Sequence, residues 1–116
     1  KDLRIILLLD CYGAFLTPRQ QEMMTHYYSE DLSLGEIAAL TGTTRQAVRD
    51  SVKRSEQVLN DMEEKLQFAE KLCALRQNYA AIAQTAETLA ANRAEPAVQY
   101  ACAAICSCVK AGLELL

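Results

Sequence analysis

The chain has 116 residues, of which 51% are apolar and 23% charged, with few aromatic side chains and no tryptophan. This length allows one compact domain, or a small domain with an appendage, and is enough to bury a core. Abundant alanine, four glycines and two prolines favour helices over a sheet. A net charge of −3 excludes a generally basic nucleic-acid binder, so any affinity for DNA must come from a local patch.

The first helix is predicted within residues 3–16, which contain the apolar run Ile5–Leu9. A short apolar run fits a strand equally well, but no second strand-like run exists to pair with it. Thr17 and Gln20 form a T-x-x-Q capping box with Pro18 between them, which predicts the start of a second helix. That helix ends before residues 29–31 and carries core-type side chains, namely Met23, Met24, Tyr27 and Tyr28.

Two helices joined by a tight turn are predicted between Ser33 and Lys53. An S-x-x-E box at Ser33 and a T-x-x-Q box at Thr43 mark the two helix starts, and Gly42 breaks the chain between them. The apolar positions that would pack the pair together are Leu34, Ile37, Ala38, Val48 and Val52. This spacing is typical of the helix-turn-helix, whose second helix lies in the DNA major groove.

The second helix of this pair carries the basic patch. Between residues 44 and 54, four Arg and Lys side chains face a single Asp, which leaves +3. Threonines at the helix start favour a phosphate contact. The first two turns can meet base edges, where Arg prefers guanine and Gln adenine, and later cations would meet phosphates. The candidate DNA-binding residues are Thr43, Thr44, Arg45, Gln46, Arg49, Lys53 and Arg54. The alternative is a solvated helix face that serves protein contacts.

Between Thr44 and Pro96 the chain contains neither proline nor glycine, which predicts one long helix or two stacked ones. Apolar spacing of four and three predicts a coiled-coil seam with one polar member, formed by Val48, Val52, Ser55, Leu59, Met62, Leu66 and Ala69. The alternation fails between Ala69 and Leu72, which predicts a bend. We therefore expect a helix-turn-helix domain over 1–70 and a helical tail over 71–116.

The tail is predicted to dimerise. After a break at 90–96, residues 97–116 are apolar on most faces, which suits a self-associating interface better than water. The candidate interface residues are Tyr79, Ile82, Leu89, Ile105 and Val109. A two-fold operator also requires two recognition helices, so a homodimer is the expected state.

Five cysteines, an odd number without a secretory leader, indicate reduced thiols in a cytoplasmic protein. Cys102 and Cys106 share a helical face, but Cys108 points elsewhere and no C-x-x-C exists, so no metal ligands and no zinc are expected. We expect no other cofactor. The run Ile5–Leu9 is too short to span a membrane, and no membrane partner is expected.

An enzyme is not expected. Asp61, Glu63 and Glu64 lie beside Lys65 and read as an ordinary charged face rather than an acid–base pair. The one histidine, His26, has no serine or cysteine at an interpretable spacing, and no glycine-rich phosphate loop is present.

Residues 3–70 resemble the YlxM-type proteins of bacteria, through the stretches DCYGAFLT, YYSEDLSLGEIA and TRQAV. These are small helix-turn-helix proteins similar to region four of sigma factors, and their genes neighbour those of the signal recognition particle. The sequence departs from the family at Arg49, where an aromatic residue is usual, and after Ala69.

The resemblance implies an all-α fold, a sigma-factor region-four-like helix-turn-helix domain followed by long helices. It also implies a DNA-binding regulator of transcription linked to the signal recognition particle pathway. The alternative is a protein-binding accessory factor of that particle, which uses the helix-turn-helix only as a scaffold.

Overall fold

The computed structural model describes residues 1–92 and 95–116, and within them it contains six α-helices and no strand. The predicted all-α fold is therefore confirmed. The described chain divides into two compact units, Lys1–Ala69 and Glu70–Leu116.

The first unit opens with α1 (Leu3–Tyr12) and α2 (Pro18–Met24), separated by a 3₁₀ turn at Gly13–Phe15. The capping box at the start of α2 is present, since the backbone N–H of Gln20 donates to the Thr17 hydroxyl and the Gln20 side chain accepts from the Thr17 N–H. α2 then continues through a π-helical turn, Thr25–Ser29, which the sequence did not predict. Met23, Met24 and Tyr28 are buried, as their predicted core role requires.

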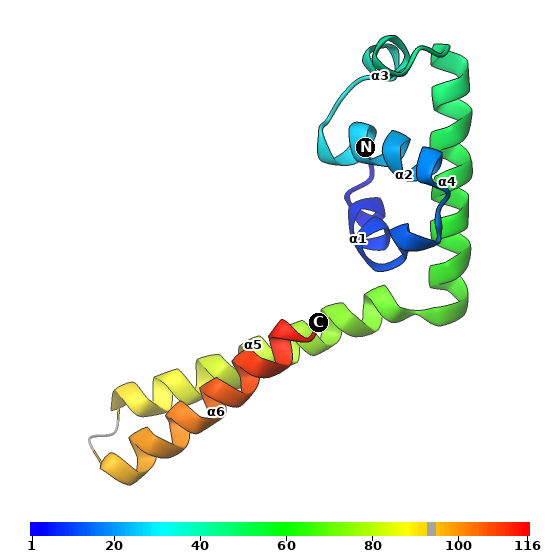
Figure 1. Cartoon of the computed structure of the whole chain (residues 1–116). Coiled ribbons are helices and arrows are strands. Elements are labelled where there is room, and N and C mark those ends of the chain that lie inside the picture. The colour runs from blue at the N-terminus through cyan, green and yellow to red at the C-terminus, as the bar shows by residue number, and fades with distance from the viewer. Residues whose placement is uncertain (93–94) are drawn as a thin grey trace. The chain divides into compact units, whose positions relative to one another are not determined.

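The long helix α4 (Arg45–Leu66) organises this unit, because α1, α2 and α3 (Leu34–Thr41) all pack on it. Figure 1 shows α4 as one continuous rod with the other three helices along one side. Four of its side chains are almost fully buried there: Val48, Val52, Ser55 and Leu59. The polar member is satisfied, since the Ser55 hydroxyl donates to the Ser51 carbonyl over 2.8 Å.

The predicted coiled-coil seam is wrong, because most of its positions serve the unit's own core. Val48, Val52, Ser55, Leu59 and Ala69 are buried there, Met62 packs against them, and α4 ends at Leu66, which is 39% exposed. Gln67 closes the helix in the left-handed conformation with φ 57°, and α5 begins at Phe68. The predicted bend between Ala69 and Leu72 therefore lies too late. A left-handed non-glycine residue costs about 1–2 kcal/mol, and nothing in the spacing announces it.

Glu63 holds the start of α5 in place. The residue is 7% exposed, and its carboxylate accepts hydrogen bonds from the Tyr12 hydroxyl at 2.6 Å and from the Ala69 N–H at 3.0 Å. The Phe68 N–H donates to the Tyr12 oxygen at 3.0 Å, so both early amides of α5 are satisfied. We call this arrangement the Glu63 cluster. The expectation that Glu63 belongs to an ordinary charged face was wrong.

The turn between α3 and α4 depends on Gly42, which adopts φ 69° and ψ 32°. The N–H groups of Gly42 and Thr43 both donate to the Ala38 carbonyl, which satisfies the end of α3. The predicted capping box at the other end of α3, between Ser33 and Glu36, is present.

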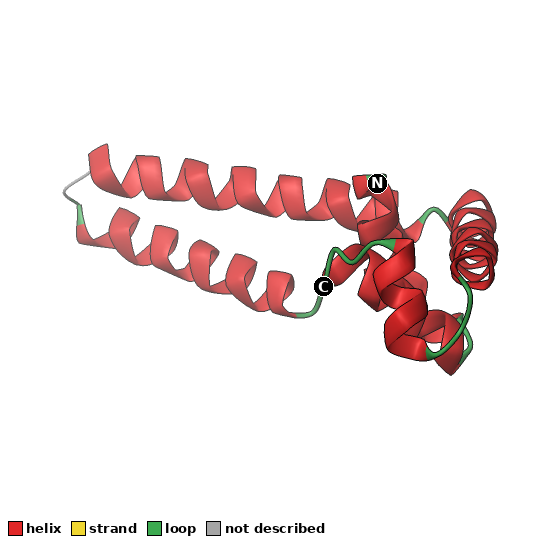
Figure 2. Cartoon of the chain, turned by 90° about the horizontal axis from the view of Figure 1, so that it is seen from above, coloured by secondary structure: helices red, strands yellow, loops and turns green. Residues whose placement is uncertain are grey.

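The second unit is a helical hairpin. α5 (Phe68–Asn92) and α6 (Pro96–Glu114) run side by side in opposite directions, as Figures 1 and 2 both show. Within the predicted break at 90–96, Pro96 occupies the first turn of α6, whereas residues 93 and 94 lie outside the described residues. A Cβ on Gly112 would lie 3.4 Å from the Tyr79 ring, which is ordinary van der Waals contact, so the Tyr79 ring packs on α6 at this position.

Replacing Tyr12 with Phe should lower the free energy of unfolding by about 1–3 kcal/mol, because it removes a donor to buried Glu63 and the acceptor of the Phe68 N–H. Urea unfolding followed by circular dichroism measures the change. Tyr100→Phe is the control, since Tyr100 is 80% exposed. Equal stabilities of the two variants would contradict the account of the Glu63 cluster.

Alkaline pH should also destabilise the first unit. Burial, reinforced by the Glu63 carboxylate, raises the pKa of Tyr12, and burial beside Glu56 raises the pKa of Tyr28. Above about pH 10 the unfolded chain therefore binds fewer protons than the folded one, and stability falls by up to ~1.4 kcal/mol per pH unit for each tyrosine. Urea titrations from pH 8 to pH 11 should show this fall, with a shallower slope in Tyr12→Phe; a flat wild-type profile would refute it.

Two glycines should respond oppositely to alanine. Gly42→Ala should cost about 1–2 kcal/mol, because the left-handed backbone is strained for any Cβ, although no described atom lies within 4 Å of the added carbon. Gly35→Ala should stabilise α3 by about 0.5 kcal/mol, because its Cβ would meet only the Ser33 hydroxyl at 4.0 Å. Thermal unfolding of both variants tests this, and a neutral Gly42→Ala would show that the turn is not conformationally constrained.

Candidate nucleic-acid interface

The start of α4 lies one residue later than predicted. Thr44, not Thr43, is the N-cap, and its hydroxyl accepts from the Ala47 N–H at 3.0 Å. The predicted box between Thr43 and Gln46 is therefore wrong. The Thr43 N–H is used by the Ala38 carbonyl at 3.1 Å, which removes it as a phosphate donor.

The corrected cap leaves two backbone donors at the tip of α4. The first N–H groups of a helix have no hydrogen-bond acceptor inside the helix. In α4 the Thr44 hydroxyl serves as the acceptor for the Ala47 N–H. The N–H groups of Arg45 and Gln46 thus remain in the first turn, where the helix dipole favours an anion. This tip is chemically suited to a phosphate oxygen.

The packing of α3 on α4 decides which face of α4 is offered to a ligand. Ile37 and Val48 are fully buried, and Ala38 and Val52 nearly so, at the contact between these helices. The face of α4 that packs on α3 is inaccessible to a ligand, so in the first turns only the side chains outside that face point to solvent. Small Ala38 allows the close approach that the tight turn requires.

Three exposed cations lie along one flank of α4, beside its packed face. Arg45, Arg49 and Lys53 are spaced four residues apart, so they stand on successive turns about 6 Å apart along the axis. We call them the cationic stripe. None of the three forms an ion pair or a side-chain hydrogen bond within the described residues. Their charges are therefore available to an anionic partner.

The stripe borders a hollow where the N-terminal ends of α3 and α4 meet. The hollow has a volume of about 460 Å³ and is lined by Leu34, Arg45, Gln46 and Arg49. Three of the four lining residues belong to the predicted DNA-binding set, so the structure brings these together. One apolar side chain beside three hydrogen-bonding ones could receive a base edge with its methyl group.

The other predicted contact residues are less well placed. The Gln46 amide donates to the Asp50 carboxylate at 3.0 Å, so this glutamine would have to change partner to read a base. Arg54 lies five residues beyond Arg49, about 140° further around the helix, and does not join the stripe. Asp50 itself adds a negative charge to the outer face, a feature that DNA contact does not require.

Among the described residues no disulfide joins any of the five cysteines, and these differ in exposure: Cys102 is buried, whereas Cys108 is exposed. In the part of the chain that the structure describes, no group of three or more His, Cys, Asp or Glu side chains could hold a metal ion.

Comparison with known proteins assigns the chain to a family. Residues 1–96 match the family UPF0122, described as "Putative helix-turn-helix protein, YlxM / p13 like". The match extends beyond the resemblance drawn from residues 3–70 and includes α5.

Several relatives carry the same family name. The UPF0122 protein of Desulforamulus reducens is 56% identical over 68 residues, which cover 59% of this chain and 58% of the relative. That of Symbiobacterium thermophilum is 52% identical over 65 residues, or 56% of this chain and 61% of the relative. The chain thus spans about three fifths of the length of these two relatives.

A longer alignment joins the chain to a UPF0122 protein of Clostridium kluyveri. The two are 38% identical over 91 residues, which cover 78% of this chain and 82% of the relative. Most of the chain matches one family, and its α3 and α4 are joined by a tight turn at Gly42, so the chain belongs to the UPF0122 family of YlxM / p13-like helix-turn-helix proteins.

Proposed function

We propose that this protein is a cytoplasmic DNA-binding regulator of transcription that places the first turns of α4 in the major groove. The observation that carries the proposal is the cationic stripe, three exposed and unpaired cations on the second helix of a helix-turn-helix. An α-helix fits the major groove of B-DNA, and the N-terminal residues of the second helix are those that meet base edges.

The residues divide into two roles. Arg45 and Arg49, in the first two turns beside the hollow, would read base edges, and Arg is suited to the two acceptors of guanine. Lys53, two turns along, would contact a phosphate, as would the backbone N–H groups at the tip of α4. Arg54 could add a phosphate contact only on a different side of the helix.

The charge distribution supports binding through this face alone. Residues 44–54 carry +3, whereas the whole chain carries −3, so the remaining surface is acidic and repels phosphate. DNA would therefore approach α4 in one orientation. Because the attraction comes from a few cations, it should weaken steeply as salt is added.

A second candidate is a protein-binding accessory factor of the signal recognition particle. It is favoured by exposed apolar side chains on the first unit, with Leu40 on α3 63% exposed and Phe15 70% exposed. Exposed apolar side chains of this kind suit protein contact better than phosphate contact. In this case the helix-turn-helix would serve only as a scaffold.

Alanine at Arg45, Arg49 or Lys53 should each weaken DNA binding, by about 1–3 kcal/mol for an arginine that reads a base. Loss of Arg45 or Arg49 should also relax sequence preference, whereas loss of Lys53 should weaken all sequences equally. Binding to pooled genomic fragments, followed by sequencing of the retained DNA, measures both effects. Lys65→Ala is the control, because Lys65 is an exposed cation in the last turn of α4.

The salt dependence of DNA binding measures the same phosphate contacts independently. About four phosphates per chain predict a log–log slope near −4, and about twice that for a two-fold complex. Each alanine variant at a phosphate-contacting position should make the slope shallower by about one. No binding to any genomic fragment at low salt would overturn the DNA proposal and favour the accessory role.

A further inference from the structure

The hairpin of the second unit buries too little to stand alone. Among its described residues only three apolar side chains are buried, namely Ala86, Cys102 and Val109, and two of these are small. The first unit buries thirteen, Ala69 included. Ordering each residue costs about 1.5 kcal/mol, so a two-helix unit with such a core needs further burial, which oligomerisation commonly supplies.

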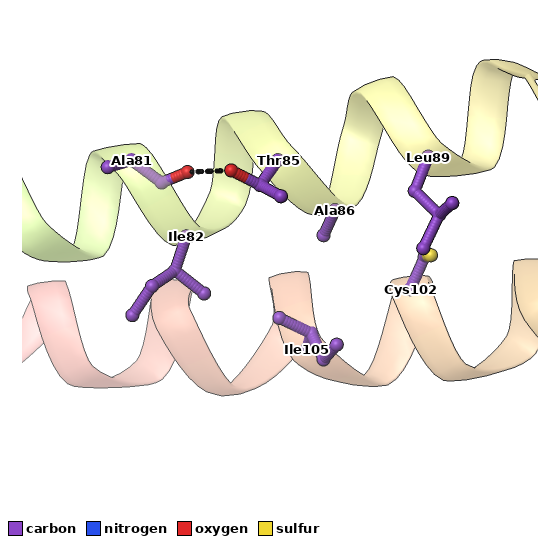
Figure 3. Close-up of a pocket in the computed structure, with 7 residues that line it drawn as sticks. All are labelled: Ala81, Ile82, Thr85, Ala86, Leu89, Cys102 and Ile105. Carbon is purple, nitrogen blue, oxygen red and sulfur yellow. Dashed lines mark hydrogen bonds between the residues drawn. The ribbon is translucent and has the colours of Figure 1, made fainter.

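The missing burial is available on one face of the hairpin. Two adjoining hollows there, of about 330 and 500 Å³, share Ile82 and Ile105 and so form a continuous apolar groove. Figure 3 shows Ile82, Ala86 and Leu89 extending from α5 toward α6, where Cys102 lies beneath Leu89. Ile82, Leu89 and Ile105 remain 42–46% exposed and stand as ridges along this groove.

Removing water from the groove costs little free energy. Among the residues that the structure describes, no charged side chain lines either hollow. The Thr85 hydroxyl is already used, since it donates to the Ala81 carbonyl at 2.9 Å. Removing water from this face would therefore leave few polar groups unsatisfied.

We infer that a second copy of this chain occupies the groove, so that two hairpins form a two-fold, four-helix bundle. The face is complementary to itself, because each copy offers both the hollows and the isoleucine and leucine ridges that would fill them. Val109, predicted in the interface, is buried inside the hairpin and would support the contact from beneath. This inference is independent of DNA binding.

Charge and size both fit a second copy. Residues 70–116 contain four Lys and Arg and four Glu, so two hairpins carry no net charge and do not repel each other. α6 has 19 residues and is about 28 Å long, and two helices ~10 Å across give a projected face on the order of 560 Å². Because side chains protrude from the helices, the buried area exceeds this projected area and comes closer to the roughly 800 Å² per partner that a standard interface buries.

A lipid surface is the competing occupant. α6 is, among the described helices, the one whose length and apolar composition would also suit a membrane span. α5, its partner in the hairpin, carries Glu70, Lys71, Arg76 and Glu87 and would be costly to insert. The neutral hairpin also lacks the surplus of cations that attracts anionic lipid. These features favour a second copy.

Light scattering of the full chain at tens of micromolar should give twice the 12.9 kDa mass of one chain. Ile82→Asp and Ile105→Asp should each weaken self-association at least ~30-fold, the effect expected of a central interface residue. Tyr100→Asp is the matched control, because Tyr100 is on α6, 80% exposed and outside both hollows. Its mass should stay that of a dimer.

The wild-type chain gives a test that does not depend on the variants folding. A dimer requires the midpoint of hairpin unfolding to fall on dilution, whereas a monomer's midpoint is constant. A one-chain mass with a constant midpoint would overturn the inference, as would a mass above two chains. Flotation with phosphatidylcholine–phosphatidylglycerol vesicles is the last arm, and binding of a monomer to them would overturn it in favour of the membrane.

Discussion

The first unit depends on one contact surface, the buried face of α4. Val48, Val52 and Leu59 receive α1, α2 and α3, so this helix has no apolar face left for another chain along its first four turns. The same packing turns Arg45, Arg49 and Lys53 outward. Core and candidate site are thus two faces of one helix, and a change in its register would move both. This explains why the unit can be small and still present a defined surface.

Much of this arrangement could be predicted from local signals. The capping boxes at Thr17 and Ser33 and the glycine at the turn act over three or four residues, so sequence spacing alone locates them. The cationic stripe could also be predicted, because positions four apart always share a helix face. The prediction missed the start of α4 by one residue, since Thr43 and Thr44 are both suitable caps and the turn decides between them.

What could not be predicted depends on partners distant in sequence. The apolar residues from Val48 to Ala69 have a spacing that fits both a coiled coil and the buried face of a single-chain core. Only the packing of α1 and α2 on α4 decides for the core. Glu63 looks like a surface carboxylate until Tyr12, which is 51 residues away, is placed beside it. Gln67 gives no local sign of its left-handed backbone, because the hydrogen bonds of the Glu63 cluster offset that strain from outside the turn.

The most direct test of DNA binding through α4 is a nuclear magnetic resonance titration of the labelled full chain with a generic DNA duplex at low salt. Non-specific binding with a Kd of about 10⁻⁴–10⁻⁶ M suffices, so the operator need not be known. We expect amide shifts to change first at Thr44–Gln46 and then along Arg49 to Lys53, while the hairpin amides of α6 stay unchanged. Shifts confined to α6 or around Leu40, or none at all, would contradict it.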